Sequence, residues 1–116
     1  MKALVIVNDG PLHGERCLTG LRLAGALLRS EGTEVSVFLV GAAVTCVVAG
    51  STGAGPNEDA ARALTRLIST GADVRVCAAS LSEHGIDDHD VLLGVVPGTA
   101  AALAALTLDA DRLLVF

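Results

Sequence analysis

The feature that most constrains this fold is a repeated alternation of two sequence patterns. The first pattern is a short apolar run, which occurs five times. The second is a helical segment, marked by apolar residues at helical spacing or by helix-capping residues, and it alternates with the first. Strands that alternate with helices form parallel sheets, because the crossover helices cover the faces of the sheet. We therefore expect a mostly parallel sheet of about five strands, covered on both faces. The expected strands are 2–8, 35–40, 74–77, 95–96 and 113–116.

Capping residues and glycines divide the chain between these strands. Asn57 precedes Glu58 and Asp59, a pattern that predicts a helix capped by Asn57, and Gly71 is expected to end this helix. Ser80 and a glutamate three positions later have capping-box spacing, which predicts a single helical turn beginning at Ser80. The other expected segments are helices at 15–32, 42–49, 87–94 and 99–108, and a loop at 50–56.

Length and hydropathy set the size of the folding unit. A chain of 116 residues fits one domain, 1–116, and leaves no length for a second core. Hydrophobic residues make up 52% of the chain, which excludes disorder. The mean hydropathy of +0.62 is high for so small a monomer. We therefore expect some apolar surface to be buried in a homo-oligomer.

Charge and composition exclude several classes of partner and location. A net charge of −5 and an aromatic content of 2% argue against nucleic-acid binding. The first apolar run is short and meets Asn8 and Asp9, so no signal peptide is expected. Residues 35–57 carry no charge, but their glycines and Pro56 favour strand, helix and loop over a membrane span. Three cysteines without an export signal indicate reduced thiols and a cytoplasmic protein.

Cys77 is the best candidate for chemistry. Ligands of open parallel sheets gather beyond the carboxyl ends of the strands, and Cys77 ends a predicted strand just before a predicted helix start. The free amides at that helix start would favour the thiolate, the form that attacks sulfur electrophiles. This placement is consistent with a persulfide carrier. The alternative, a small buried hydrophobic residue, has equal support from position alone.

The other two cysteines are interpreted differently. Cys17 lies on the first predicted helix, and Cys46 lies in an apolar segment of small residues. Core packing is the better interpretation for both, because free cysteine is among the most buried residue types. Cys46 stays a supporting candidate, since its helix starts beside a strand end and could face the same cleft as Cys77.

A cluster of histidines and aspartates follows Cys77, but it does not predict a metal site. Its spacing matches no familiar zinc or iron pattern, and two of its carboxylates are explained as helix-start residues. A histidine that donates a proton near Cys77 is favoured over a metal ligand, and His84 is the closer in sequence, while a solvated surface histidine remains the default interpretation. Neither a dinucleotide fingerprint, a phosphate loop nor a Cys-x-x-Cys pair occurs in the sequence, so no cofactor is expected. The cluster consists of His84, Asp87, Asp88, His89 and Asp90.

Several segments in the same order resemble the DsrE/DsrF-like family, especially its YchN-type members. The similarity spans almost the whole chain, which makes it more specific than any single motif. The segments are 5–11, 14–16, 21–24, 38–44, 76–77, 85–86, 105–108 and 110–112.

The resemblance implies a three-layer α/β/α sandwich and trimers or hexamers with cysteine loops near the subunit interfaces. It also implies that Cys77 holds sulfur as a persulfide between a sulfur-donor and a sulfur-acceptor protein, as in a sulfurtransferase-like subunit. Ser80 stands where many YchN-type members have a second cysteine. Glu83 and His84 stand where the sulfur-relay subunits often have basic residues. These three positions depart from the family pattern, and they are kept as supporting candidates beside Cys77.

Two other functions stay open at this point. One is a non-catalytic oligomeric binding or scaffold protein with the same fold, which a buried Cys77 or a raised pKa of its thiol would favour. The other is a thiol redox sensor, in which Cys77 pairs with a partner thiol across a subunit interface.

Overall fold

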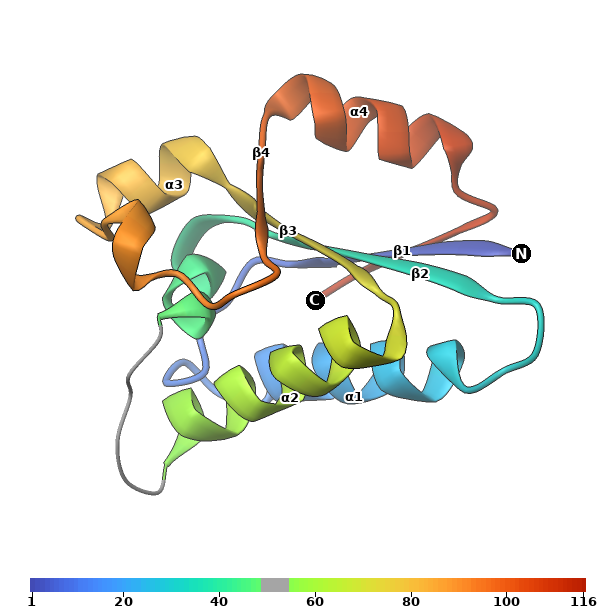
Figure 1. The fold of residues 1–116 in the computed structure, drawn as a ribbon, viewed down its shortest axis with the longest axis horizontal. Coiled ribbons are helices and arrows are strands. Elements are labelled where there is room, and N and C mark those ends of the chain that lie inside the picture. The colour runs from blue at the N-terminus through green and yellow to red at the C-terminus, as the bar shows by residue number, and fades with distance from the viewer. Residues whose placement is uncertain (49–54) are drawn as a thin grey trace.

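A computed structural model describes residues 1–48 and 55–116. Its centre is a sheet of five strands in the order β4-β3-β2-β1-β5, and every neighbouring pair in it is parallel (Figure 1). The predicted parallel sheet of five strands is therefore confirmed. The strands are β1 (Lys2–Val7), β2 (Glu34–Leu39), β3 (Asp73–Cys77), β4 (Val96–Gly98) and β5 (Arg112–Val115).

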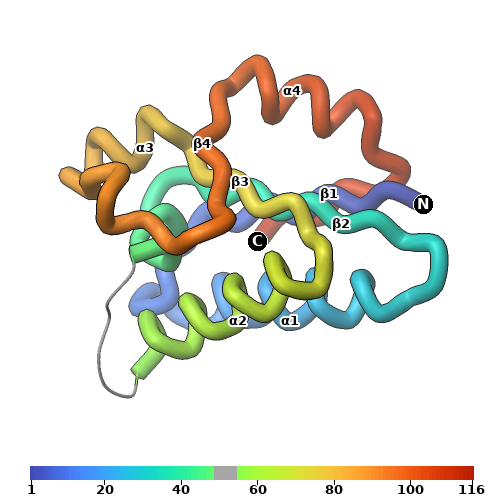
Figure 2. Tube along the Cα trace, viewed as in Figure 1, coloured from blue at the N-terminus to red at the C-terminus, as the bar shows by residue number. Residues whose placement is uncertain are grey.

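The helices lie on both faces of the sheet, which confirms the three-layer α/β/α arrangement. The chain trace shows α1 and α2 together under one face and α4 over the other, with α3 beside the end of β3 (Figure 2). The α-helices are α1 (Arg16–Leu28), α2 (Pro56–Thr70), α3 (Ala78–Glu83) and α4 (Ala100–Asp109), and the 3₁₀ helices are η1 (Gly41–Val47) and η2 (Asp88–Asp90).

The main core lies between the sheet and the α1–α2 layer. Alternate residues of β2 and β3 point to this layer, because side chains of a strand alternate between its two faces. On β3 these are Val74 and Val76, which are fully buried, whereas Arg75 between them is partly exposed. The opposite layer is thinner, since α4 has no fully buried residue in the described structure. The sheet is thus covered well on one face and lightly on the other.

Several predicted helix boundaries are confirmed and others are wrong. Thr99 caps α4 by accepting a hydrogen bond from the Ala102 amide at 3.2 Å, as predicted. The prediction that Asn57 caps α2 is wrong, because the helix begins at Pro56, which suits a first helical position that needs no amide hydrogen. Asp87 caps η2, but this single turn ends at Asp90 instead of continuing to Gly94. Of the predicted loop at 50–56, residues 50–54 lie outside the described residues.

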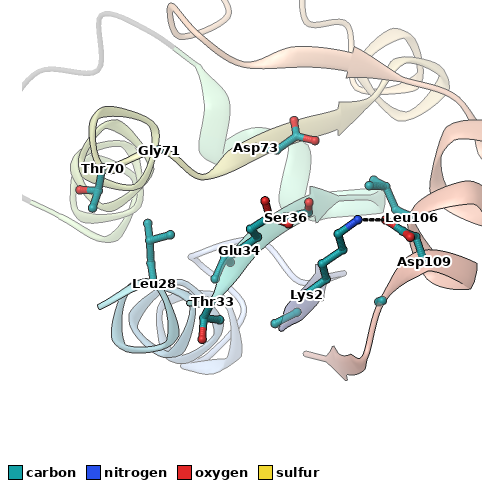
Figure 3. Close-up of a pocket in the computed structure, with 13 residues that line it drawn as sticks. Lys2, Leu28, Thr33, Glu34, Ser36, Thr70, Gly71, Asp73, Leu106 and Asp109 are labelled. Atoms are coloured by element: carbon teal, nitrogen blue, oxygen red, sulfur yellow. Dashed lines mark hydrogen bonds and ion pairs between the residues drawn. The ribbon is translucent and has the colours of Figure 1, made fainter. Parts of the chain in front are cut away.

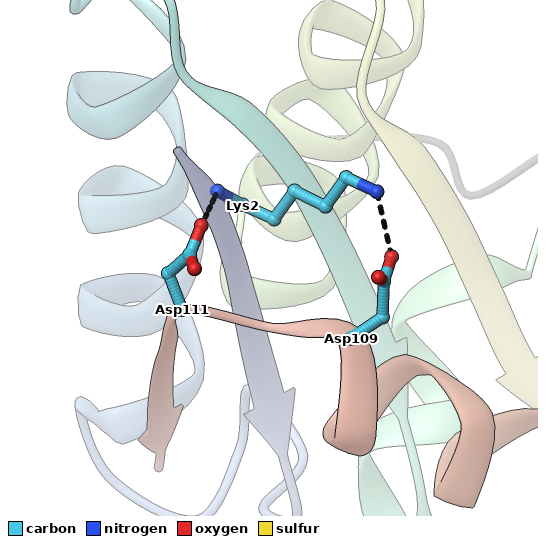
Figure 4. A network of polar contacts seen from close by, with 3 residues as sticks. All are labelled: Lys2, Asp109 and Asp111. Carbon is cyan, nitrogen blue, oxygen red and sulfur yellow. Dashed lines mark hydrogen bonds and ion pairs between the residues drawn. The ribbon is translucent and has the colours of Figure 1, made fainter.

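A polar contact joins the C-terminal end of the fold to β1 (Figure 4). The Lys2 amide donates to Asp111 Oδ2 at 2.8 Å, and the Asp111 amide donates to the Lys2 carbonyl at 2.8 Å. Lys2 Nζ also donates to Asp109 Oδ2 at 2.8 Å. Together these bonds hold the connection between α4 and β5 against the first strand.

The uncharged stretch at 35–57 does not form one long helix in its described parts. It contains most of β2, all of η1 and the first residues of α2. Within the two described ranges, no helix combines the length and the apolar character needed to cross a membrane.

Candidate functional site

Cys77 is the last residue of β3 and the N-terminal cap of α3. The helix begins at Ala78, immediately after the strand, so the predicted start at Ser80 is wrong. The reason is that Cys77 keeps an extended conformation, with φ −63° and ψ 115°, from which the chain turns directly into the helix. Cys77 is therefore the cap itself, and it sits closer to the first-turn amides than the sequence pattern indicated.

Ser80 lies in the first turn of α3 and is 8% exposed. Its Oγ accepts a hydrogen bond from the Gly41 amide at 3.0 Å, which ties the end of β2 to the helix that follows β3. Gly41 begins η1 with φ +57°, a left-handed conformation that glycine adopts without steric cost. Because the oxygen accepts from Gly41, its hydroxyl hydrogen is available to donate elsewhere. A tertiary contact, and not helix capping, thus explains why serine is buried here.

The groups around Cys77 lower the pKa of its thiol. The largest cause is hydrogen bonding from the Ser80 hydroxyl, and the backbone amides of Ser80 and Ala79 act in the same direction. Partial desolvation and the negative charge of Glu83 oppose them. The Cys77 side chain makes no capping hydrogen bond of ordinary geometry to these backbone amides, so the Ser80 hydroxyl is the leading donor. Cys77 is a partly exposed residue with a lowered pKa, which are the properties of a reactive cysteine.

The remaining supporting candidates lie in different places. His84 follows α3, and its Nδ1 donates to the Ser80 carbonyl at 2.9 Å, so its ring belongs to the C-terminal end of the helix that Cys77 begins. Glu83 is exposed on the last helical position. Cys46 is buried as predicted, but its sulfur contacts Cys17 instead, at 3.0 Å. The structure thus places Ser80 beside Cys77 and gives Cys46 a different partner.

The histidine and aspartate segment after α3 forms a capped turn. Asp87 Oδ1 accepts from the His89 amide at 3.2 Å, which uses the carboxylate locally. Across the part of the chain that the structure describes, no three side chains of His, Cys, Asp or Glu come together as a group that could hold a metal ion.

A cavity of about 510 Å³ lies at the opposite edge of the sheet, beside the amino ends of the strands (Figure 3). Lys2, Glu34, Asp73 and Asp109 contribute its charged lining, and Cys77 does not line it. A second hollow, of about 640 Å³, lies between α1 and α2, and Cys77 does not line it either. The candidate site is therefore a partly exposed thiol at the carboxyl ends of the strands, and it lies in neither hollow.

Comparison with known proteins assigns the chain to a family. The model of the DsrE/DsrF-like family matches residues 1–116. The chain belongs to the DsrE/DsrF-like family. This family is related to sulfur-relay proteins, and its match covers both the cysteine loop around Cys77 and the closing segment of β5.

Individual relatives agree with this assignment. Protein YchN of Escherichia coli K12 is 33% identical over 118 residues, covering 99% of this chain and 98% of the relative, and Protein YchN of Shigella flexneri matches to the same extent. The crystal structure of the ychN protein from E. coli superposes with a TM-score of 0.88 at 34% identity, covering 100% of both chains. A protein of unknown function from Methanobacterium thermoautotrophicum shares the fold, with a TM-score of 0.72 at 15% identity over 96% of both chains.

Two features of this DsrE/DsrF-like protein were missed by the sequence reasoning. The first is the contact between Cys17 and Cys46, which lie 29 positions apart on separate elements. The second is Gly98, which pairs in register with Cys77 across β3 and β4. The only sequence signal for Gly98 was its place in a Pro-Gly pair, which indicated a turn and not a position inside a strand.

Proposed function

We propose that this protein carries sulfur as a persulfide on Cys77, in the manner of a sulfurtransferase-like subunit. The observation that carries the proposal is the placement of a partly exposed Cys77 at the N-terminal cap of α3, where Ser80 and the first-turn amides lower the pKa of the thiol. Membership of a family related to sulfur-relay proteins supports the same assignment.

The chemical step requires only a thiolate and a persulfide donor. The Cys77 thiolate attacks the terminal sulfur of the donor persulfide, a new S–S bond forms, and the donor's own S–S bond breaks as the donor leaves as a thiolate. Delivery repeats the reaction in the other direction: an acceptor thiolate takes the terminal sulfur and Cys77 leaves as a thiolate. A lowered pKa of the Cys77 thiol serves both steps, because it supplies the nucleophile and then makes Cys77 a better leaving group.

Ser80 favours a carrier over a dithiol oxidoreductase. A cysteine at this position could attack the Cys77 persulfide, form an internal disulfide and expel hydrosulfide. A serine hydroxyl does not perform that reaction, so the persulfide on Cys77 is kept for an external acceptor. In this proposal the partners are a sulfur-donor protein and a sulfur-acceptor protein in the cytoplasm, where thiols stay reduced.

The test uses a variant in which Cys77 is the sole cysteine. The Cys17→Ala/Cys46→Ala protein, treated with inorganic polysulfide and desalted, is expected to gain the mass of one or more sulfur atoms, and dithiothreitol should remove them. The matched control is Cys77→Ser, which keeps the two buried cysteines. The proposal is wrong if Cys77→Ser takes up sulfur as well as the parent, or if the sole-cysteine protein takes up none.

The same measurement separates the alternative functions. A buried Cys77 or a raised pKa of its thiol would favour a non-catalytic scaffold. Cys77 is instead partly exposed, and the pKa of its thiol is lowered. A thiol redox sensor would instead give a disulfide between Cys77 residues of two subunits after treatment with peroxide. Non-reducing electrophoresis would detect that dimer, and uptake of sulfur by Cys77 without it supports the carrier.

Assembly into a homo-oligomer is part of the proposal. The thin layer of the fold leaves apolar side chains exposed on α4 and on the edge strand β5, including Leu108 at 88% and Val115 at 61%. An exposed apolar helix beside an open strand edge is the kind of surface that a second copy of the chain covers. A trimer or hexamer built through this surface would also account for the high mean hydropathy of +0.62.

A further inference from the structure

Two buried thiols meet inside the protein, where α1 and η1 come together. Cys17 is the second residue of α1 and Cys46 lies within η1. Their sulfur atoms are 3.0 Å apart, and the two residues are 0% and 1% exposed. Nonbonded carbon atoms in a protein core approach to about 3.5–4.0 Å. The two sulfurs are therefore in direct contact, and the sequence-based interpretation of each cysteine as simple core packing leaves this pairing unexplained.

We propose that Cys17 and Cys46 form an internal disulfide when the protein meets a hydroperoxide, which makes this pair a second thiol centre. The proposal does not rest on persulfide transfer at Cys77. Both functional groups are already in contact, so the bond requires the sulfurs to approach by about 1 Å, toward the S–S length of about 2.05 Å.

The reaction proceeds in two balanced steps. The Cys17 thiolate attacks one oxygen of hydrogen peroxide, the O–O bond breaks, and a sulfenic acid forms while hydroxide leaves and takes up a proton. The Cys46 sulfur then attacks the Cys17 sulfur, the S–S bond forms, and the sulfenic oxygen leaves as water with the Cys46 proton. Together the two thiols lose two electrons and two protons, and the peroxide is reduced to two water molecules.

The contact between the thiols assigns these roles. The hydrogen bond between the two sulfurs lowers the pKa of Cys17, while the same bond and burial raise the pKa of Cys46. In this proposal Cys17, whose pKa is shifted downward by the contact, is the thiolate that reacts with peroxide. Cys46 keeps its proton and acts as the resolving thiol.

The position of the pair links the new bond to the rest of the fold. The bond would join the first turn of α1 to η1, the segment that begins at Gly41 and donates the hydrogen bond to Ser80. It would close a loop between residues 29 positions apart, which restricts the unfolded chain. We therefore expect the oxidised protein to unfold at a higher urea concentration than the reduced protein.

The experiment uses Cys77→Ser, in which Cys17 and Cys46 are the only thiols. The folded variant is treated with hydrogen peroxide, quenched, denatured and alkylated with N-ethylmaleimide. The expected product is lighter than the reduced protein by two hydrogen atoms and takes up no maleimide, and dithiothreitol restores two alkylation sites. Trypsin places the cysteines on peptides 17–22 and 30–62, so a crosslink between these peptides identifies the bond.

The matched controls are Cys17→Ala/Cys77→Ser and Cys46→Ala/Cys77→Ser, each with one thiol. After peroxide they should gain oxygen atoms or form dimers between chains, and neither should lose two hydrogens as a monomer. The proposal is overturned if Cys77→Ser keeps two alkylation sites after a peroxide treatment that consumes Cys77 in the parent. It is also overturned if the two cysteines are lost only as oxygen adducts or crosslinks between chains, or if the oxidised and reduced proteins unfold at the same urea concentration.

Discussion

Gly98 gives the sharpest test of how the sheet holds the cysteine strand. It lies in β4 opposite Cys77 in β3, and a Cβ added at this position would lie 2.7 Å from Cζ and 2.8 Å from Cε2 of Phe38. Phe38 is 1% exposed and has little space in which to move its ring. The φ angle of Gly98 is not positive, so the backbone itself would accept alanine. The Gly98→Ala substitution therefore isolates a steric effect in the core.

The expected magnitude follows from two opposing contributions. Overpacking a well-packed core costs about 1–3 kcal/mol. Replacing glycine by alanine also restricts the unfolded chain, which raises the free energy of unfolding by about 0.4–1 kcal/mol. We expect a net destabilisation of about 1–2 kcal/mol, which lowers the urea midpoint by roughly 0.5–1 M for a protein of this size. The chain contains no Trp and no Tyr, so far-UV circular dichroism should follow the unfolding.

The control is a glycine with space around it. A Cβ on Gly25 in α1 would find its nearest neighbours at 3.8 and 3.9 Å, so Gly25→Ala should stabilise the helix by about 0.5–1 kcal/mol. Adding Phe38→Leu, which removes the ring atoms nearest to the new methyl group, should recover part of the stability lost in Gly98→Ala. The reasoning is refuted if Gly98→Ala is as stable as the parent, or if its effect and that of Phe38→Leu are simply additive.

Three further substitutions test the site and the surface. Ser80→Ala removes the main cause of the lowered pKa of Cys77, so the pH midpoint for alkylation by iodoacetamide should move upward, and an unchanged midpoint would contradict the role of the hydroxyl. Leu108→Glu places a charge on an 88% exposed position of α4 and should reduce the oligomer measured by light scattering, with unchanged circular dichroism. Asp111→Ala removes the side chain that accepts from the Lys2 amide and should cost about 0.5–1.5 kcal/mol in urea unfolding, whereas no loss would show that the contact is not stabilising.

Much of the fold could be predicted because its signals are local. The apolar runs marked the five strands to within a few residues, and the Gly71 and Thr99 boundaries followed from the chemistry of helix ends. One error occurred where two local signals competed. Asn57 and Pro56 both indicate a helix start, and Pro56 took the first position.

The candidate site could be predicted only in part. The sequence placed Cys77 at the end of a strand, and the structure confirms that position. Ser80 was predicted as a cap, yet its side chain bonds to Gly41, 39 positions away in the chain. His84 was expected near the thiol, and its ring bonds to the carbonyl of Ser80, a contact that the sequence did not indicate. Contacts of this kind depend on how separate elements cross, and periodicity carries no information about them.

For Cys77 itself, sequence alone determined the position: strand alternation and neighbouring residues place a thiol at the carboxyl edge of a parallel sheet. Only the tertiary structure decided its surroundings, because the donors that lower its pKa depend on where α3 begins and on what Ser80 contacts. The pairing of Cys17 with Cys46 was decided in the same way. Burial drives both cysteines inward, but only the packing of α1 against η1 brings the two sulfur atoms together.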